Sequence, residues 1–152
     1  MKKTIKLTTP GNYIFTLDQK GQELEVLAFL QAKDQENLNL NISIIHKTAQ
    51  TKAKVIIKAT VDDQAQVKIT GKIKINKNCP QVKSFLTEKV LLLSKTARAQ
   101  AIPDLEILSD EVSCSHSLSI SPIPEEQIFY LKARGISEDE AKKMIAEAFL
   151  TN

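Results

Sequence analysis

The feature that most constrains this chain is a change of hydrophobic period near residue 121. Up to that point apolar and polar residues alternate, which is the pattern of a strand with one buried face. Beyond it, apolar residues recur at helical spacing. The alternation is clearest over residues 38–44 and 67–75. The sequence therefore predicts a β unit over residues 1–121 and a helical hairpin over residues 122–152.

Short polar separators divide the β unit into strands at intervals of roughly ten residues. The separators, such as residues 62–64, are too short to hold a helix, so strand follows strand. This pattern is typical of a sandwich, a barrel or a β-solenoid, and no exact repeat decides among the three. Shorter strands are expected at residues 13–17, 24–30, 54–61, 90–93 and 105–108.

Helix signals are clear after residue 121. Pro124 suits a first helical position, where its missing N–H is not needed. Gly135 provides a left-handed stop, and Ser137 with Glu140 has the spacing of a capping box. The second helix then carries an apolar stripe of Ala141, Met144, Ile145, Ala148 and Phe149.

The composition indicates one folded domain with little excess charge. The chain has 152 residues, of which 42% are hydrophobic and only 5% aromatic, so its core must consist mainly of Ile, Val and Leu. The net charge of +3 is mild, whereas a nucleic-acid binder usually shows a denser basic stripe. We expect no nucleic-acid partner and interpret Lys68, Lys72 and Lys74 as a solvated face. A stripe that binds an anion or RNA is the alternative.

The N-terminus and the cysteine content point to a reducing compartment. The basic start of the chain lacks the apolar segment of a signal peptide. No stretch approaches the roughly 20 apolar residues of a membrane span. Cys79 and Cys114 are too few for a disulfide framework. We expect a cytoplasmic protein with reduced thiols and no membrane association.

Cys114 and His116 form the most interesting polar pair. On a strand they point to the same face, and both residue types bind borderline metals. Two ligands are fewer than the four of a structural zinc site, and only His46 and Cys79 could add to them. The alternative is a half-exposed strand with one small buried Cys and one surface His.

Catalytic motifs are missing from the sequence. Cys114 and His116 have no evident third group to orient the imidazole and no neighbouring glycine-rich turn. No phosphate-binding loop or dinucleotide fingerprint occurs. The adjacent acids Asp110 and Glu111 are better explained by a turn or a cap. We expect no catalytic residues.

Four ordered motifs resemble the C-terminal part of the SufB/SufD family of iron–sulfur cluster assembly proteins. They are LLLS at 91–94, PDLEI at 103–107, DEVSCSH at 110–116 and EQIFYLKARGI at 126–136. The resemblance implies a mainly β fold, a right-handed parallel β-helix of a few turns followed by a C-terminal two-helix hairpin. Family members are far longer, so this short solenoid would leave an uncapped end for a partner or a second copy to cover.

The resemblance also implies a role as a non-catalytic scaffold in an iron–sulfur cluster assembly complex. The partners would be a SufC-type ATPase and a SufB-like subunit, or a second copy in a homodimer. No cofactor would be held permanently, although an iron–sulfur cluster would be bound transiently. The ATPase would dock on the hairpin, through Gln127, Phe129, Tyr130, Lys132, Arg134 and Gly135.

The motif positions favour the SufD branch. The family's motif His falls on His116 and its motif Cys on Cys114, which the resemblance implies as cluster residues, whereas the Cys of the SufB branch falls near Ala97 and is absent. The Gly-Ala-Thr that follows the motif His is replaced by Ser-Leu-Ser at residues 117–119. Two alternatives therefore stay open: a degenerate structural adaptor without a cluster role, and an unrelated β protein that binds anions or RNA.

Overall fold

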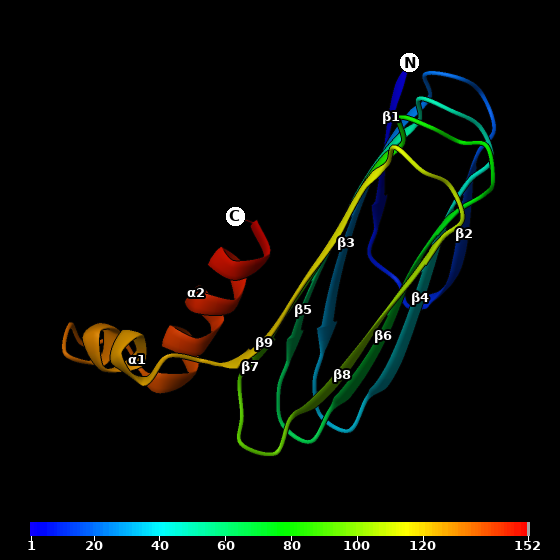
Figure 1. Cartoon of the computed structure of the whole chain (residues 1–152). Coiled ribbons are helices and arrows are strands. Elements are labelled where there is room, and N and C mark those ends of the chain that lie inside the picture. The colour runs from blue at the N-terminus through cyan, green and yellow to red at the C-terminus, as the bar shows by residue number, and fades with distance from the viewer. Residues whose placement is uncertain (152) are drawn as a thin grey trace.

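The computed structural model describes residues 1–151 and shows a parallel β-solenoid of about four turns, with two helices beside one end (Figure 1). Strands β1, β3, β5, β7 and β9 form one sheet, and β2, β4, β6 and β8 form the other. The strands are β1 Lys2–Leu7, β2 Gly11–Leu17, β3 Glu23–Ala32, β4 Asn37–His46, β5 Lys52–Val61, β6 Gln66–Ile75, β7 Lys83–Leu92, β8 Arg98–Ile107 and β9 Ser113–Pro122. The predicted β-solenoid is thus confirmed, while its right-handed winding stays a prediction.

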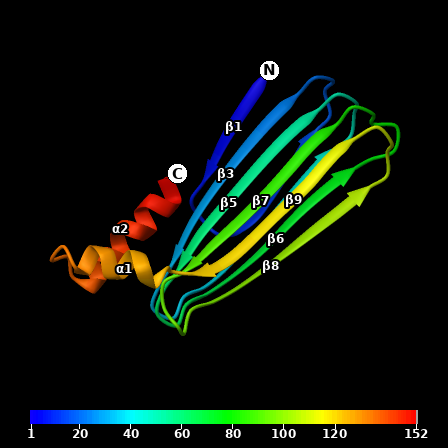
Figure 2. The same ribbon diagram turned by 60° about the vertical axis from the view of Figure 1, so that its left-hand side comes forward.

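The two sheets face each other and bury the inward side of the middle strands β3 to β7. Figure 2 shows the five strands of the first sheet side by side, with β9 at its edge. The parallel register places equivalent inward residues in columns, such as Val26, Val55 and Leu86, all nearly inaccessible to solvent. Stacked aliphatic columns of this kind remove apolar surface from water, which is the main driving force for the fold.

The corners of the solenoid repeat without repeating the sequence. Asp34 and Asp63 both adopt the left-handed conformation, and the Asp34 N–H donates to the Asp63 carboxylate at 3.0 Å. At another corner the Gln50 amide donates to the Gln81 side chain at 2.9 Å. These paired residues are 29 and 31 positions apart. A turn of the solenoid therefore consumes about that many residues, although no exact repeat marks it.

Several strands differ from their predicted extents. β1 was not predicted, and residues 90–93 proved to be only the end of β7. Glu88 at an inward position of β7 broke the apolar alternation, which explains that error. β8 begins at Arg98, well before the predicted residue 105. Its first inward positions hold small alanines, so the apolar alternation there was not evident. Pro103 is tolerated there because β8 lies at the edge of its sheet.

The helices α1 Glu125–Lys132 and α2 Glu138–Thr151 form the predicted hairpin. Pro124 is the N-cap of α1 rather than its first helical residue, and it provides no side-chain cap. Gly135 has a φ of 84°, and the Glu140 N–H donates to Ser137 Oγ, as the capping-box spacing predicted. Neither helix of the described residues is long and apolar enough to cross a membrane.

The hairpin attaches to the outer face of the first sheet. α2 packs against β5, whereas α1 packs against α2 and buries none of its own residues. The predicted division at 121/122 falls between the last two residues of β9, just before α1; as two separate units it stays a prediction. Residue 152 of the predicted hairpin lies outside the described residues.

Candidate functional site

The solenoid core is left open where β8 and β9 end the two sheets. Leu105 and Ile107 on β8, and Leu118 and Ile120 on β9, are each about 40% exposed. The residues that precede them in their columns, such as Ile73 and Val90, are fully buried. Inward side chains of the last turn therefore have no further turn packed on them. We call this surface the open end.

Cys114 and His116 lie on the inner face of β9 at the open end. They continue the columns that contain Ser84 and Leu86 on β7, and both are half-buried. The structure thus brings both predicted residues to one face, as expected for alternate positions of a strand. Burial raises the pKa of the Cys114 thiol, which keeps it protonated and weakly nucleophilic.

Glu88 is the residue that the sequence interpretation missed. It points into the core from β7 and is fully buried, and its Oε2 lies 3.3 Å from Nε2 of His116. Oε1 has no hydrogen-bond partner among residues 1–151. Burial raises the pKa of the Glu88 carboxyl group, while the hydrogen bond and charge of His116 oppose that rise. A signal existed, because Glu88 is the one charged residue in the inward row of β7.

Gly71 makes room for this carboxylate from the opposite sheet. A Cβ atom at position 71 would lie 2.7 Å from Glu88 Oε1 and 2.5 Å from Leu86 Cδ2. Any larger residue would therefore collide with the side chain that contacts His116. Gly71 is a second site residue that the sequence interpretation did not single out.

His46 lies at a closed position in the core. It is fully buried, with Nδ1 2.7 Å from Thr51 Oγ1 and Nε2 3.0 Å from Ser84 Oγ. Burial lowers the pKa of His46 to about 4, so the ring is neutral at pH 7. Both ring nitrogens are satisfied, which is the arrangement of a structural histidine.

Among residues 1–151, metal ligands do not gather into a complete set. Cys79 is buried near the backbone carbonyls of His46 and Lys77, and burial raises the pKa of its thiol. Within the described part of the chain, no three His, Cys, Asp or Glu side chains are placed to hold one metal ion. Cys114 and His116 would therefore need further ligands from outside these residues.

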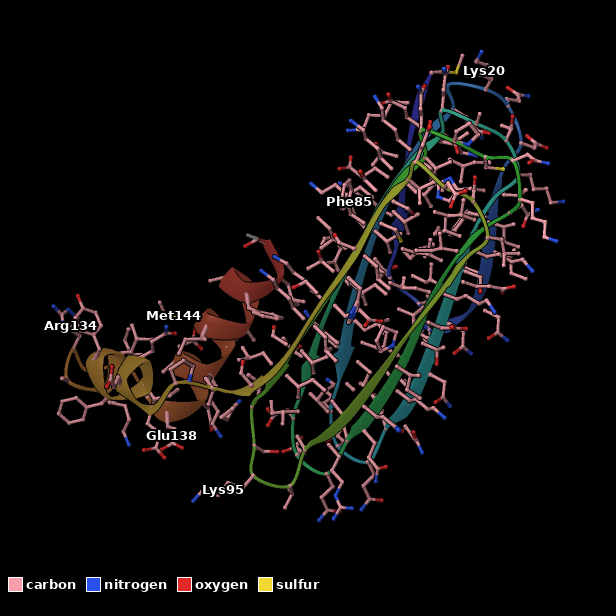
Figure 3. All side chains as sticks on the ribbon, in the orientation of Figure 1. Lys20, Phe85, Lys95, Arg134, Glu138 and Met144 are labelled. Carbon is pink, nitrogen blue, oxygen red and sulfur yellow. The ribbon has the colours of Figure 1, made fainter. Side chains whose placement is uncertain are left out.

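The hairpin presents an aromatic surface away from the solenoid. Phe129 is 75% and Tyr130 55% exposed, and the Arg134 guanidinium stacks 3.6 Å from the Tyr130 ring centre. Lys132 pairs with Glu138 at 3.2 Å. Figure 3 shows Arg134 at the part of the hairpin far from the strands. Four of the predicted docking residues thus lie on the outer part of the hairpin.

Gln127 and Gly135 have different surroundings. Gln127 lines a cavity of about 580 Å³ between the hairpin and the sheet, which Lys58 and Lys89 also line. Lys58 is almost fully buried and donates to the carbonyl of Phe149 at 3.0 Å, which ties the end of α2 to β5. Gly135 shapes the turn between the helices. Gln127 therefore faces the junction, and it also lines a second cavity together with Tyr130.

Two of the three lysines of β6 form ion pairs with acids of β8. Lys72 pairs with Asp104 at 3.2 Å and with Glu106 at 3.4 Å, and Lys74 pairs with Glu106 at 3.2 Å. The hydrogen bond to Asp104 contributes most to the raised pKa of Lys72. Such pairs support the interpretation of a solvated face and weaken that of a stripe for RNA.

Comparisons with known proteins identify the family of this chain. Residues 7–149 match the family described as SUF system FeS cluster assembly, SufBD core domain. The chain belongs to the SufBD family. It is SufD-like, with 34% identity over 104 residues to the iron–sulfur cluster assembly protein SufD of Escherichia coli.

Other relatives carry the same family name. A SufBD family protein of Staphylococcus saprophyticus is 32% identical over 70% of this chain. One of Synechocystis is 28% identical over 91% of the chain. The matched region spans 25%, 23% and 30% of the lengths of the three relatives, in the order given. The chain therefore corresponds to a minor part of each.

Proposed function

We infer that this chain is a non-catalytic SufD-like subunit of an iron–sulfur cluster assembly complex. It pairs with a SufB-like chain, or with a second copy, through the open end, and it docks a SufC-type ATPase on the hairpin. A cytoplasmic location, where both thiols remain reduced, is part of the proposal. The observation that carries it is the open end itself, where an aliphatic core ends in exposed Leu118 and Ile120 beside His116 and Cys114.

Pairing at the open end is supported by its apolar surface. Leu105, Ile107, Leu118 and Ile120 expose side chains that earlier turns bury completely. Contiguous exposed apolar residues of this kind mark interaction surfaces. The outermost strands of both sheets also offer backbone groups that a partner can pair with. A partner that covers this surface would complete the core.

Docking on the hairpin is supported by its exposed aromatic residues. Phe129 and Tyr130 project from a helix that buries none of its residues, and Arg134 covers one face of Tyr130. Aromatic and Arg side chains are enriched among the residues that dominate binding energy in protein interfaces. Gln127 and Gly135 would act indirectly, through the junction and the turn.

Transient cluster binding would use His116 and Cys114, with the cluster as cargo. Both residue types are iron ligands. Residues 1–151 place no third ligand beside these two, so the partner would provide the remaining ligands. The raised pKa of the Cys114 thiol keeps it protonated in the free chain. It would have to release this proton on binding iron, because the thiolate is the ligand.

Co-purification with a SufC-type ATPase tests whether the ATPase docks on the hairpin. The wild-type chain should retain the ATPase, and Phe129→Ala with Tyr130→Ala should lose it. Phe85→Ala is the matched control, because Phe85 is an exposed aromatic residue on the outer face of β7 (Figure 3). Failure of the wild type to bind, with its helices intact by circular dichroism, would count against the proposal.

A purely structural adaptor is the second candidate. The lack of a third metal ligand among residues 1–151 and the serines at 117 and 119 favour it. The two candidates separate in anaerobic reconstitution of the complex with iron and sulfide. A lower cluster yield for His116→Ala supports the cluster role. An unchanged yield, with ATPase binding still dependent on the hairpin, supports the adaptor.

A further inference from the structure

The two ring nitrogens of His116 have different surroundings. Nε2 lies 3.3 Å from the Glu88 carboxylate, and it is the one ring nitrogen of His116 with a hydrogen-bond partner among residues 1–151. The side chain is 19% exposed, whereas Glu88 is completely buried. One edge of the imidazole therefore faces a fixed acceptor in the core, and the ring as a whole remains reachable from the open end.

The position of Glu88 is costly for the fold. Its column consists otherwise of apolar residues, namely Leu7, Ala28, Ile57 and Leu118. A carboxylate in such a column loses hydration, and here one oxygen gains no hydrogen bond in return. An aliphatic residue would pack there at lower cost. The carboxylate therefore needs an explanation other than core packing.

Gly71 shows that the opposite sheet accommodates this carboxylate. The missing side chain at position 71 leaves the space that Oε1 occupies. Glu88 can then stay extended toward β9, with Oε2 against His116. Two sheets thus contribute to holding one oxygen at one imidazole nitrogen.

We propose that Glu88 is a positioning residue for His116, which accepts the Nε2–H and thereby leaves Nδ1 as the nitrogen that binds iron or a cluster. The assignment of Nδ1 to iron rests on the proposed function, whereas the hydrogen bond between Glu88 and Nε2–H does not. Metal-binding histidines generally donate their other N–H to a carboxylate, carbonyl or water, which fixes the tautomer and the ring orientation. Glu88 occupies the place of that partner.

Nitrogen NMR of the full 152-residue chain with ¹⁵N-labelled histidine tests the proposal directly. The chain has only two histidines, so the spectrum is simple. We expect a proton on Nε2 of His116 that exchanges slowly with water, and an unprotonated Nδ1 in the neutral ring. A proton on Nδ1 in the wild type would overturn the proposal, because Glu88 would then be the donor.

Two variants of Glu88 separate positioning from simple packing. Glu88→Leu removes the acceptor, and the Nε2–H signal of His116 should vanish by exchange with water. Glu88→Gln keeps an acceptor oxygen, so the signal should persist. The His46 signals serve as an internal control for an intact core, because that ring is bonded to Thr51 and Ser84. An identical His116 signal in Glu88→Leu and wild type would contradict the proposal.

Anaerobic reconstitution of the complex distinguishes the two proposals. Glu88→Leu should weaken iron or cluster retention about 10- to 100-fold, the usual effect of losing such a partner, and Glu88→Gln should restore part of it. If the NMR result holds but His116→Ala leaves the cluster yield unchanged, the cluster role fails and the hydrogen bond stands. If His116→Ala lowers the yield but the NMR result fails, the cluster role stands and the positioning role is wrong.

Discussion

The two histidines of this chain point into the solenoid core from opposite sheets and occupy opposite kinds of position there. His46 lies in a middle turn, fully buried, with a hydroxyl group on each ring nitrogen. His116 lies in the last turn, partly exposed, with one nitrogen on a buried carboxylate. A middle turn has neighbours on both sides to satisfy its polar groups, whereas the last turn has them on one side only. In this solenoid the histidine that remains accessible to a ligand is therefore the one at the open end.

Alanine replacement of each histidine should show the largest difference between the two positions. His46→Ala leaves a cavity and two hydroxyls without their partner, so we expect the free energy of unfolding to fall by about 2–4 kcal/mol. His116→Ala should cost less than about 1 kcal/mol, because the ring is partly exposed. Urea denaturation of both variants measures the difference. Equal losses would show that His116 is also a core residue.

The pH dependence of stability should follow His46. Its pKa is lowered to about 4 in the folded chain from 6.5 in the unfolded chain. Between these values the unfolded state binds the extra proton, so stability should fall as the pH drops from 7 to 4. The contribution of His46 to this loss is roughly 3 kcal/mol, since one pKa unit corresponds to about 1.4 kcal/mol, and the raised pKa of Glu88 acts in the opposite direction. Denaturation of the His46→Ala variant should lack this loss, and its persistence there would assign it to other groups.

Gly71→Ala should disturb the hydrogen bond between Glu88 and His116 and leave the surroundings of His46 unchanged. The added Cβ would crowd Leu86 and the Glu88 carboxylate, and such overpacking costs about 1–3 kcal/mol. The carboxylate should also move away from His116, so the slowly exchanging Nε2–H should be lost. Lys68→Ala, an exposed position on β6, is the control. An unchanged Nε2–H in Gly71→Ala would mean that Glu88 does not need this space.

Glu88→Leu should stabilise the chain in a pH-dependent way. The folded-state pKa of Glu88 is raised above 4.5, so the folded state holds its proton more tightly than the unfolded state does. The destabilisation by Glu88 is therefore absent at low pH and grows as the pH rises above 4.5. At pH 7 the variant should gain about 1–2 kcal/mol, measured by urea denaturation. A variant less stable than wild type at pH 7 would show that the carboxylate contributes favourable interactions.

Much of the fold was predictable because several strands alternate clearly between apolar and polar residues. Residues 38–44 and 67–75 lie within β4 and β6, and Ser137, Glu140 and Gly135 act at the predicted helix ends. Periodicity alone did not distinguish a solenoid from a sandwich or a barrel. Its turns are matched through the backbone conformations of residues such as Asp34 and Asp63, which need no repeated sequence. The family resemblance made that choice, and the structure confirmed it.

The candidate site was predictable only where motifs pass through it. Cys114 and His116 stood out by residue type, and alternation placed them on one face. Glu88 was not recognised because a single inward charge in a strand looks like the end of an apolar pattern. Gly71 was not interpreted as a site residue, since its role depends on a side chain from the other sheet. Contacts between sheets are set by the winding of the chain, which local patterns do not contain.

Hydrogen–deuterium exchange of the full chain, with and without a SufB-like partner, tests whether the open end is the pairing surface. We expect the partner to slow amide exchange in β8 and β9, at the open end, and to leave exchange around His46 in β4 unchanged. Protection confined to β1 and β2, or no protection despite measured binding, would contradict the assignment of the open end as the pairing surface.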